Sequence, residues 1–247
     1  IEATADHLVL ACDTHKGRRI WREVRHLKPG MRLIQRTDTS IETESEDRAE
    51  DEAALAGWLQ ADGFVGQYET GTNTSLTLEA MTINDDERTY VDHLITQVFP
   101  SAHYHVRHVD ARDSSLDIRR IRIYGEQARD FVNRYELLNR HLEMEVPQRV
   151  LNGGHSVVVA YLRSLFQADG CVRIRKDRQT SDIVFGTISP KLAVGVSHLL
   201  NNLGIYNRIV PCKDPRDNRQ TYYQVVIAWK SEKAKFAEMI GFVSADK

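Results

Sequence analysis

The chain has 247 residues, of which 41% are hydrophobic, and its 33 Lys plus Arg and 35 Asp plus Glu give a formal net charge of −2. This length and hydrophobic content predict one large or two small domains with a real core, and argue against a disordered or collagen-like chain. Without an apolar run near the roughly 18 residues of a membrane span, and with three scattered cysteines that fit no disulfide framework, we expect a cytoplasmic protein of a prokaryotic cytosol or nucleoid, with no membrane partner.

The near-neutral net charge averages over unlike parts of the chain. Residues 1–50 carry 9 basic and 10 acidic side chains (−1), residues 51–150 carry 10 and 17 (−7), and residues 151–247 carry 14 and 8 (+6). Such an asymmetry is typical of a surface that binds a polyanion, although a basic block is as often an ordinary solvated face. The last third of the chain is therefore a candidate nucleic-acid surface.

Residues 1–50 differ from the rest of the chain. The segment EATADHLVL (2–10) resembles the Thr-x-x-His block of intein splicing domains, with Thr4 and His7 at the matching positions, and WREVRHLKPGMRL (21–33) resembles the strand and turn that follow. Splicing also needs an N-terminal nucleophile before this segment and a C-terminal His-Asn pair, and this sequence has neither. We therefore expect a partial, β-rich intein (Hint-like) segment that does not splice, followed by a solvated acidic linker at Glu42–Glu52.

Two segments 107 residues apart share a motif. Residues 53–66 read AALAGWLQADGFVG and residues 160–173 read AYLRSLFQADGCVR, both with the tetrad Gln-Ala-Asp-Gly. Similarity at a fixed spacing indicates a duplicated structural unit. Each apolar run predicts a helix that ends at the aspartate, with a glycine suited to the left-handed C′ conformation just after it.

The predicted elements after each copy also repeat. The first half has strands at 64–69 and 76–83, a helix at 87–98, strands at 103–109 and 118–124, and a helix at 126–138; the second has strands at 171–175 and 183–188, a helix at 191–203, strands at 208–212 and 222–229, and a helix at 231–240. A capping-box pattern at Asn84 and Glu87, and Ser189 before Pro190, support two of the helix starts. We predict an α+β fold with one αββαββα half at residues 51–150 and another at 151–247.

Each motif helix carries two small residues four positions apart, Gly57 with Ala61 and Ser164 with Ala168. Residues at this spacing share a helix face, and small side chains let two backbones approach closely. We therefore predict that the two helices pack together and bring Asp62 and Asp169 near each other. Like charges at close range raise a carboxyl pKa or require a cation, and Mg²⁺ takes oxygen ligands.

The motifs LAGWLQADG and LRSLFQADG resemble the two nonapeptides of a single-chain LAGLIDADG homing endonuclease, and the resemblance covers about residues 50–247. It implies two αββαββα halves whose four-stranded sheets form a DNA-binding saddle, with the motif helices at the centre. It also implies that Asp62 and Asp169, with main-chain carbonyls at Ala61 and Ala168, hold divalent ions against the scissile phosphates. We interpret the chain as an intein-encoded member of this kind, monomeric and active in intein homing.

The implied activity is hydrolysis of two phosphodiesters of a double-stranded DNA target site, with Mg²⁺ as the cofactor, Mn²⁺ as a plausible one and Ca²⁺ as a non-cleaving substitute. A basic residue after the last helix of each half would assist: Lys247 matches in the second half, and Arg140 or His141 is the candidate in the first. Read alone, Lys247 is equally consistent with a solvated residue. At the sixth motif position Gln60 and Gln167 replace Asp, but that position is not a metal ligand in the family.

Basic and amide side chains after each motif form a candidate DNA surface. Strand alternation places Arg173 and Arg175 on the face opposite Val172 and Ile174. The predicted DNA-binding residues are Gly66, Tyr68, Arg107, Arg119, Arg120, Arg122, Arg173, Arg175, Arg208, Lys213, Arg216, Arg219, Gln220 and Gln224. Arg and Gln can read guanine and adenine edges, while phosphate contacts fix the register. Each of these positions is also consistent with an ordinary rim or solvent-exposed residue.

Other classes of function stay open. A catalytically inactive DNA-binding regulator or an RNA maturase could use the same fold, and a generic α+β domain could show pseudo-symmetry without any site. The presence of both Asp62 and Asp169 disfavours the inactive regulator but does not separate a nuclease from a maturase. Metal-dependent double-strand cutting of DNA would separate them.

Overall fold

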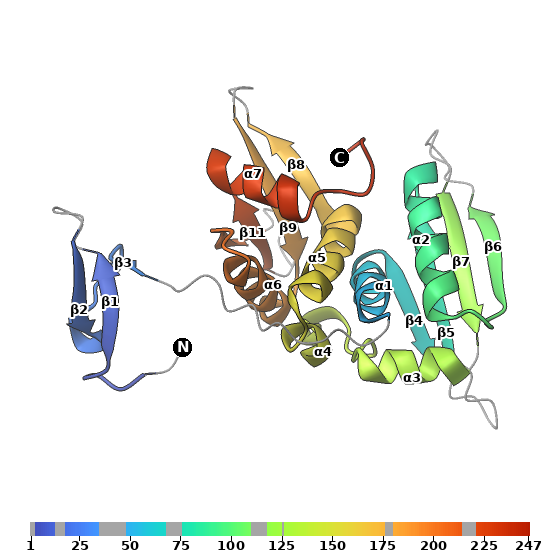
Figure 1. The fold of residues 1–247 in the computed structure, drawn as a ribbon, viewed down its shortest axis with the longest axis horizontal. Coiled ribbons are helices and arrows are strands. Elements are labelled where there is room, and N and C mark those ends of the chain that lie inside the picture. The colour runs from blue at the N-terminus through green and yellow to red at the C-terminus, as the bar shows by residue number, and fades with distance from the viewer. Residues whose placement is uncertain are drawn as a thin grey trace. The chain divides into compact units, whose positions relative to one another are not determined.

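The computed structural model of the chain (Figure 1) describes residues 3–12, 18–34, 48–67, 76–109, 118–124, 126–175, 180–213 and 221–247. The chain forms two compact units, residues 1–39 and 40–247. The predicted domain boundaries at residues 50 and 150 stay predictions. None of the helices in the described ranges is long and apolar enough to cross a membrane.

The first unit contains a small antiparallel sheet of order β2-β1-β3. Its strands are β1 (Leu8–Cys12), β2 (Arg19–Glu23) and β3 (Arg32–Leu33), and the 3₁₀ turn η1 (Val24–His26) follows β2. The backbone N–H of His7 donates to the carbonyl of Thr4 at 3.1 Å, which closes a turn just before β1.

The second unit repeats one order of helices and strands. The first set is α1 (Ala49–Ala61), β4 (Gly63–Gln67), β5 (Leu76–Thr82), α2 (Asp85–Val98), β6 (Tyr104–Val109), β7 (Ile118–Tyr124) and α3 (Glu126–Arg134). The short elements η2 (His141–Glu143) and α4 (Gln148–Leu151) connect it to the second set. That set is α5 (His155–Asp169), β8 (Gly170–Ile174), β9 (Ser181–Thr187), α6 (Pro190–Asn202), β10 (Arg208–Cys212), β11 (Tyr222–Ile227) and α7 (Lys230–Met239). The predicted α+β fold with two αββαββα sets is confirmed.

The two larger sheets have the same topology. Their strand orders are β4-β5-β7-β6 and β8-β9-β11-β10, and every neighbouring pair is antiparallel. Figure 1 shows α1 and α5 side by side at the centre, with one sheet beyond each of them. The repeat in the sequence is therefore a repeat in space.

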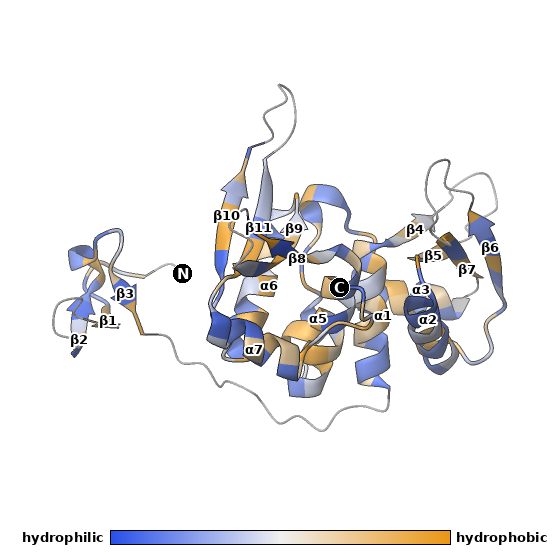
Figure 2. Cartoon of the chain, turned by 90° about the horizontal axis from the view of Figure 1, so that it is seen from above, coloured by the Kyte–Doolittle hydropathy of each residue, from blue (hydrophilic) through white to orange (hydrophobic). Residues whose placement is uncertain are grey.

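Each of these sheets has one face packed against helices and one face turned away from them, which we call the free face. Alternate residues of the inner strands supply the packed faces: Leu78, Ala80, Ile121 and Ile123 in the first sheet, and Ile183, Phe185, Val225 and Ile227 in the second. The hydropathy colouring of Figure 2 shows apolar segments in α1, α5 and the strands that they cover. The residues between these positions point to the free faces.

Helices α1 and α5 meet backbone to backbone. A Cβ atom on Gly57 would lie 2.5 Å from the carbonyl oxygen of Tyr161, so only glycine allows this approach. The hydroxyl of Ser164, the counterpart of Gly57, lies 2.9 Å from the hydroxyl of Tyr90 on α2. The packing predicted from the small residues is confirmed.

The glycines after the two motif aspartates do not take the expected left-handed conformation, so that expectation was wrong. Gly170 has φ −85° and ψ 161°, and Gly63 is not among the glycines with positive φ. A Cβ atom would lie 2.4 Å from Cα of Leu59 at Gly63, and 2.4 Å from the carbonyl oxygen of Phe166 at Gly170. Each strand starts directly at its glycine and passes against the last helical turn, so close approach, not positive φ, requires glycine here.

Two helix starts agree with the sequence prediction, and a third differs from it. Asn84 Oδ1 accepts from the backbone N–H of Glu87 at 2.9 Å, and Ser189 Oγ accepts from that of Leu192 at 3.1 Å, which confirms both caps. Helix α1 begins at Ala49, so the end of the predicted acidic linker is helical, and residues 42–47 of that linker lie outside the described residues. Its acidic first turn faces the positive end of the helix dipole.

Candidate functional site

Asp62 and Asp169 stand at the ends of the two central helices. Asp62 is the C-cap of α1, and Asp169 is the last residue of α5. Desolvation raises the pKa of Asp62, the Glu87 carboxylate raises it further, and the charge of Lys247 lowers it. Desolvation also raises the pKa of Asp169 to about 6, with Asp62 adding to the rise and Lys247 opposing it. The helix pair thus brings two carboxylates into each other's field.

Lys247 lies at the end of α5. Its Nζ donates to the carbonyl of Gly170 at 2.7 Å and to that of Ala168 at 3.3 Å. Its charge lowers the pKa of both Asp62 and Asp169. The structure therefore places the sequence-predicted lysine beside the two aspartates.

Arg140 and His141, the two candidates for the assisting basic residue of the first half, lie in different environments. Nη1 of Arg140 lies 3.5 Å from the carbonyl of Leu59, one helical turn before Asp62, and burial lowers the pKa of its guanidinium. Nη2 of Arg140 is buried without a hydrogen-bond partner among the described residues. His141 is exposed and begins η2 with φ 56°. Arg140, rather than His141, contacts the motif helix.

Glu87 is a third carboxylate near the site. The sequence analysis predicted it only as part of a helix capping box, not as a residue of the site. It is 3% exposed, its Oε1 accepts from Nε2 of Gln167 at 2.8 Å, and its Oε2 accepts from the N–H of Ile83 at 2.9 Å. Its charge raises the pKa of Asp62. A buried carboxylate therefore adds negative charge beside Asp62.

The oxygen atoms at the helix ends fit a hard divalent ion. The described ranges contain no group of three or more His, Cys, Asp or Glu that could enclose a metal. Mg²⁺ does not need such a cage, because it keeps several waters and usually binds one or two carboxylates together with substrate phosphates. Asp62 and Ala61 line a pocket of about 460 Å³ that also includes Glu79, Arg120 and Arg122 of the first free face. This site is thus open to a substrate.

The predicted DNA-binding residues of the first sheet divide between its faces. Arg107 is the Cα partner of Arg120, and both lie on the free face. Gly66 lies on the same face, because it pairs with Thr77, which in turn pairs with Tyr124. Arg122 follows Arg120 at the next free-face position. Arg119 is opposite Thr82, on the face that carries Ile121 and Ile123. Tyr68 lies outside the described residues.

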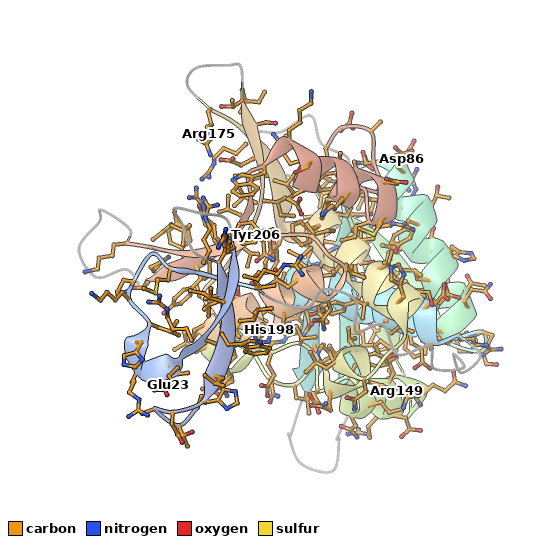
Figure 3. All side chains as sticks on the ribbon, turned by 60° about the vertical axis from the view of Figure 1, so that its left-hand side comes forward. Glu23, Asp86, Arg149, Arg175, His198 and Tyr206 are labelled. Carbon is orange, nitrogen blue, oxygen red and sulfur yellow. The ribbon has the colours of Figure 1, made fainter. Side chains whose placement is uncertain are left out.

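The predicted residues of the second sheet gather on its free face. They are Arg173 and Gln224, joined by a 3.0 Å hydrogen bond, Arg175 just past β8, and Arg208 opposite Val226. Figure 3 labels Arg175 near the end of its strand. Lys213 is exposed after β10, while Arg216, Arg219 and Gln220 lie outside the described residues. The predicted alternation of Arg173 and Arg175 against Val172 and Ile174 is consistent with the pairing of Val172 with Ile183.

Two buried acidic residues on the free faces, Glu79 and Asp182, were not predicted. Each forms ion pairs with two of the predicted arginines. Strand alternation alone could have indicated the face of each, but the partners depend on pairing between strands that the sequence does not display.

Comparison with known proteins identifies related sequences and folds. A family profile described as LAGLIDADG-like domain matches residues 156–241. A replicative DNA helicase DnaB of Rhodothermus marinus is 28% identical over 253 residues, a match that spans 99% of this chain and 25% of that protein. A second one, from Synechocystis sp., is 31% identical over 109 residues, 44% of this chain and 12% of that protein. The chain thus spans about a quarter of the length of the first relative and less of the second.

Solved structures share the fold at low identity. A variant of the homing endonuclease I-DmoI matches 79% of this chain and 97% of its own, with a TM-score of 0.56 and 18% identity. The N-terminal LAGLIDADG domain of DUF199/WhiA matches 81% of this chain and 85% of its own, with a TM-score of 0.51 and 13% identity. Structures of I-DmoI with DNA were determined with Mn or in the presence of Mg. The mixed α+β fold of this chain matches that of LAGLIDADG homing endonucleases.

Proposed function

We propose that this chain is a site-specific double-strand DNA endonuclease that hydrolyses phosphodiesters with divalent metal ions. The observation that carries the proposal is the pair Asp62 and Asp169, held at adjoining ends of α1 and α5 in each other's field and beside Lys247. Two carboxylates at a helix interface have no evident structural purpose, because each disfavours the charge of the other.

The residues of the site have distinct parts in this proposal. Asp62 and Asp169, with main-chain oxygens at Ala61 and Ala168, would hold Mg²⁺, or Mn²⁺ in its place, with Ca²⁺ binding but not supporting cleavage. The bound ions would activate water and stabilise the charge on the phosphate oxygens. Lys247 supplies positive charge at the same place, and Arg140 is the corresponding cation near α1. The free faces of the two sheets would bind a double-stranded target, with one monomer covering both half-sites.

We also propose that the endonuclease belongs to an intein of a prokaryotic protein and acts in intein homing. The support is the Thr-x-x-His block at Thr4 and His7, which precedes the antiparallel pair of β1 and β2. The match to helicase relatives that are several times longer than this chain agrees with an inserted region.

A DNA-binding protein without cleavage is the second candidate. The same fold occurs in the LAGLIDADG domain of DUF199/WhiA (TM-score 0.51) as well as in the homing endonuclease I-DmoI (TM-score 0.56), so the fold by itself does not imply cleavage. The fold is thus compatible with both candidates, and the two aspartates favour the nuclease.

Cleavage of an unbiased DNA pool tests the proposal. The protein would be incubated with plasmids carrying randomised inserts, with Mg²⁺ or with EDTA, and the ends of double-strand breaks would be sequenced. We expect breaks at one recurring sequence with Mg²⁺ only, and at least a hundredfold loss in Asp62→Asn and in Asp169→Asn with DNA binding retained. Asp86→Asn, an exposed residue of α2 labelled in Figure 3, is the matched control and should cut normally. Cutting in EDTA, or full activity of Asp62→Asn, would refute the nuclease, and binding without any cutting would support the second candidate.

A further inference from the structure

Asp182 on β9 lies beneath two of the candidate DNA-binding arginines. Its carboxylate accepts from Nε and Nη2 of Arg175 at 3.0 and 2.9 Å, and from Nη2 of Arg173 at 3.1 Å. The residue is only 1% exposed. The hydrogen bonds from Arg175 hold the pKa of Asp182 below its usual value, against the effect of burial. Asp182 is thus ionised and covered by its two guanidinium partners.

The partners of Asp182 extend across the free face of the second sheet. Arg173 and Asp182 are Cα partners in β8 and β9, and Nη1 of Arg173 donates to Oε1 of Gln224 on β11 at 3.0 Å. One carboxylate therefore organises a row that crosses three strands. Bidentate pairing fixes the plane of a guanidinium as well as its position.

The first sheet contains a similar cluster built from different positions. Glu79 on β5 is 8% exposed and forms ion pairs with Arg120 and Arg122, both on β7. In the aligned sheets Thr77, not Glu79, is the counterpart of Asp182, because Gly63 pairs with Ala80 where Gly170 pairs with Phe185. The same arrangement, one buried carboxylate with two arginines, thus occurs on each free face.

A carboxylate on a surface that binds DNA has opposing effects. It repels phosphates and cancels positive charge, which weakens sequence-independent binding. It also holds long side chains in one orientation before DNA arrives, so less side-chain entropy is lost when they bind. A guanidinium has five N–H donors, which exceeds the number used by the contacts of Arg173 described above. Weaker sequence-independent binding together with pre-oriented arginines would favour selective contacts over unselective ones.

We propose that Asp182 is a specificity-determining positioning residue, which holds Arg173 and Arg175 in the orientation that reads base edges in the half-site bound by the second sheet. The inference rests on the proposed function only in that the free face binds DNA; it does not need cleavage. Asp182 acts through the arginines and need not contact the DNA itself.

The test compares selective and unselective binding in EDTA, so that cleavage has no part in it. A preferred duplex would be selected from a randomised pool, and its dissociation constant compared with that of a scrambled duplex over a range of salt concentrations. In Asp182→Asn we expect tighter binding of the scrambled duplex, a steeper salt dependence, and a loss of about tenfold or more in the ratio of the two constants. Glu238→Gln, an exposed residue of α7 in the same half, removes the same charge and should leave the ratio unchanged.

A second variant keeps the test valid if Asp182→Asn does not fold, which circular dichroism would reveal. The double change Arg173→Lys and Arg175→Lys keeps the charge but loses the bidentate contacts, so we expect the ratio to fall while scrambled binding and salt dependence stay near wild type. A ratio that stays unchanged in the folded variants would overturn the inference, and so would a wild-type protein that selects no sequence. Failure of the nuclease proposal would appear separately, as selective binding without Mg²⁺-dependent cutting.

Discussion

Gln167 of α5 donates a 2.8 Å hydrogen bond from Nε2 to Oε1 of Glu87 on α2, and thereby links the second motif helix to the first half. Its Oε1 accepts from the backbone N–H groups of Val243 and Ser244 at 2.9 and 3.2 Å, in the segment that leads to Lys247. Gln60 also bridges between the halves: its Nε2 donates to the carbonyl of Glu145, and its Oε1 accepts from the hydroxyl of Tyr161. The glutamines of the two repeated motifs therefore connect elements around the site.

Gln167→Ala should lower both stability and cleavage. It removes the donor to the buried Glu87 carboxylate and the acceptor for two N–H groups near Ser244, so we expect a loss of about 1–3 kcal/mol in the free energy of unfolding. Urea denaturation measures this loss. Gln148→Ala removes an exposed glutamine that bonds to Asn152 and serves as the control, with a change within about 0.5 kcal/mol. An equally small change at Gln167 would show that the bridge contributes nothing.

Gly57→Ala should force α1 and α5 apart. The new Cβ would lie 2.5 Å from the carbonyl oxygen of Tyr161, a backbone atom that cannot move alone. Overpacking of this kind costs about 1–3 kcal/mol, measurable as a lower melting temperature. Gly186→Ala is the control, because its Cβ would meet nothing within 4 Å. Equal melting temperatures for the two variants would contradict the close packing.

In the metal-free protein, the contribution of Asp169 to the free energy of unfolding should increase as the pH is lowered from 7 toward 5. Its pKa is about 6 in the folded state against the usual 3.8, so between these values the folded state binds a proton that the unfolded state does not. The contribution of this group to stability is therefore largest below pH 4 and is lost as the pH rises through 6. Chemical denaturation in EDTA at several pH values measures it. Asp169→Asn should flatten the profile in this window, and a wild-type profile that is already flat would contradict the raised pKa.

Lys247→Met should reduce cleavage by about a hundredfold and raise the pKa of Asp169 further, since the lysine charge now lowers it. Single-turnover cleavage gives the first effect, and NMR titration of the carboxyl group gives the second. Lys230→Met, at the exposed start of α7, removes the same charge away from the site and should change neither. A loss of cleavage without a shift of the Asp169 pKa would show that Lys247 does not act through its charge on Asp169.

The sequence predicted the features that depend on local spacing. The 107-residue repeat located both motif helices, the small residues at Gly57 and Ser164 predicted their packing, and the caps at Asn84 and Ser189 predicted two helix starts. The caps are local signals, and the helix packing could be predicted because the repeat identified two helices with small residues at matching positions.

Features that depend on strand register, or on which individual side chains meet across elements, could not be predicted. The pairing of Asp182 with Arg173 follows from the register of β8 and β9, and the contact of Glu87 with Gln167 follows from the placement of α2 beside α5. The face of Arg119 is likewise settled by its position opposite Thr82. The left-handed conformation expected at the motif glycines was wrong, because the strand direction after Gly63 is set by the sheet that it joins.

The contact between Gly57 and Tyr161 has a consequence for the proposed endonuclease. Because main-chain atoms meet there, no side chain can adjust the distance between α1 and α5 at this point, and Asp62 and Asp169 stand at the ends of these helices. The stagger between the two cuts would then be a fixed length built into the helix pair. Substitutions on the sheets could alter which sequence is bound, while the distance between the cleaved phosphates would stay the same.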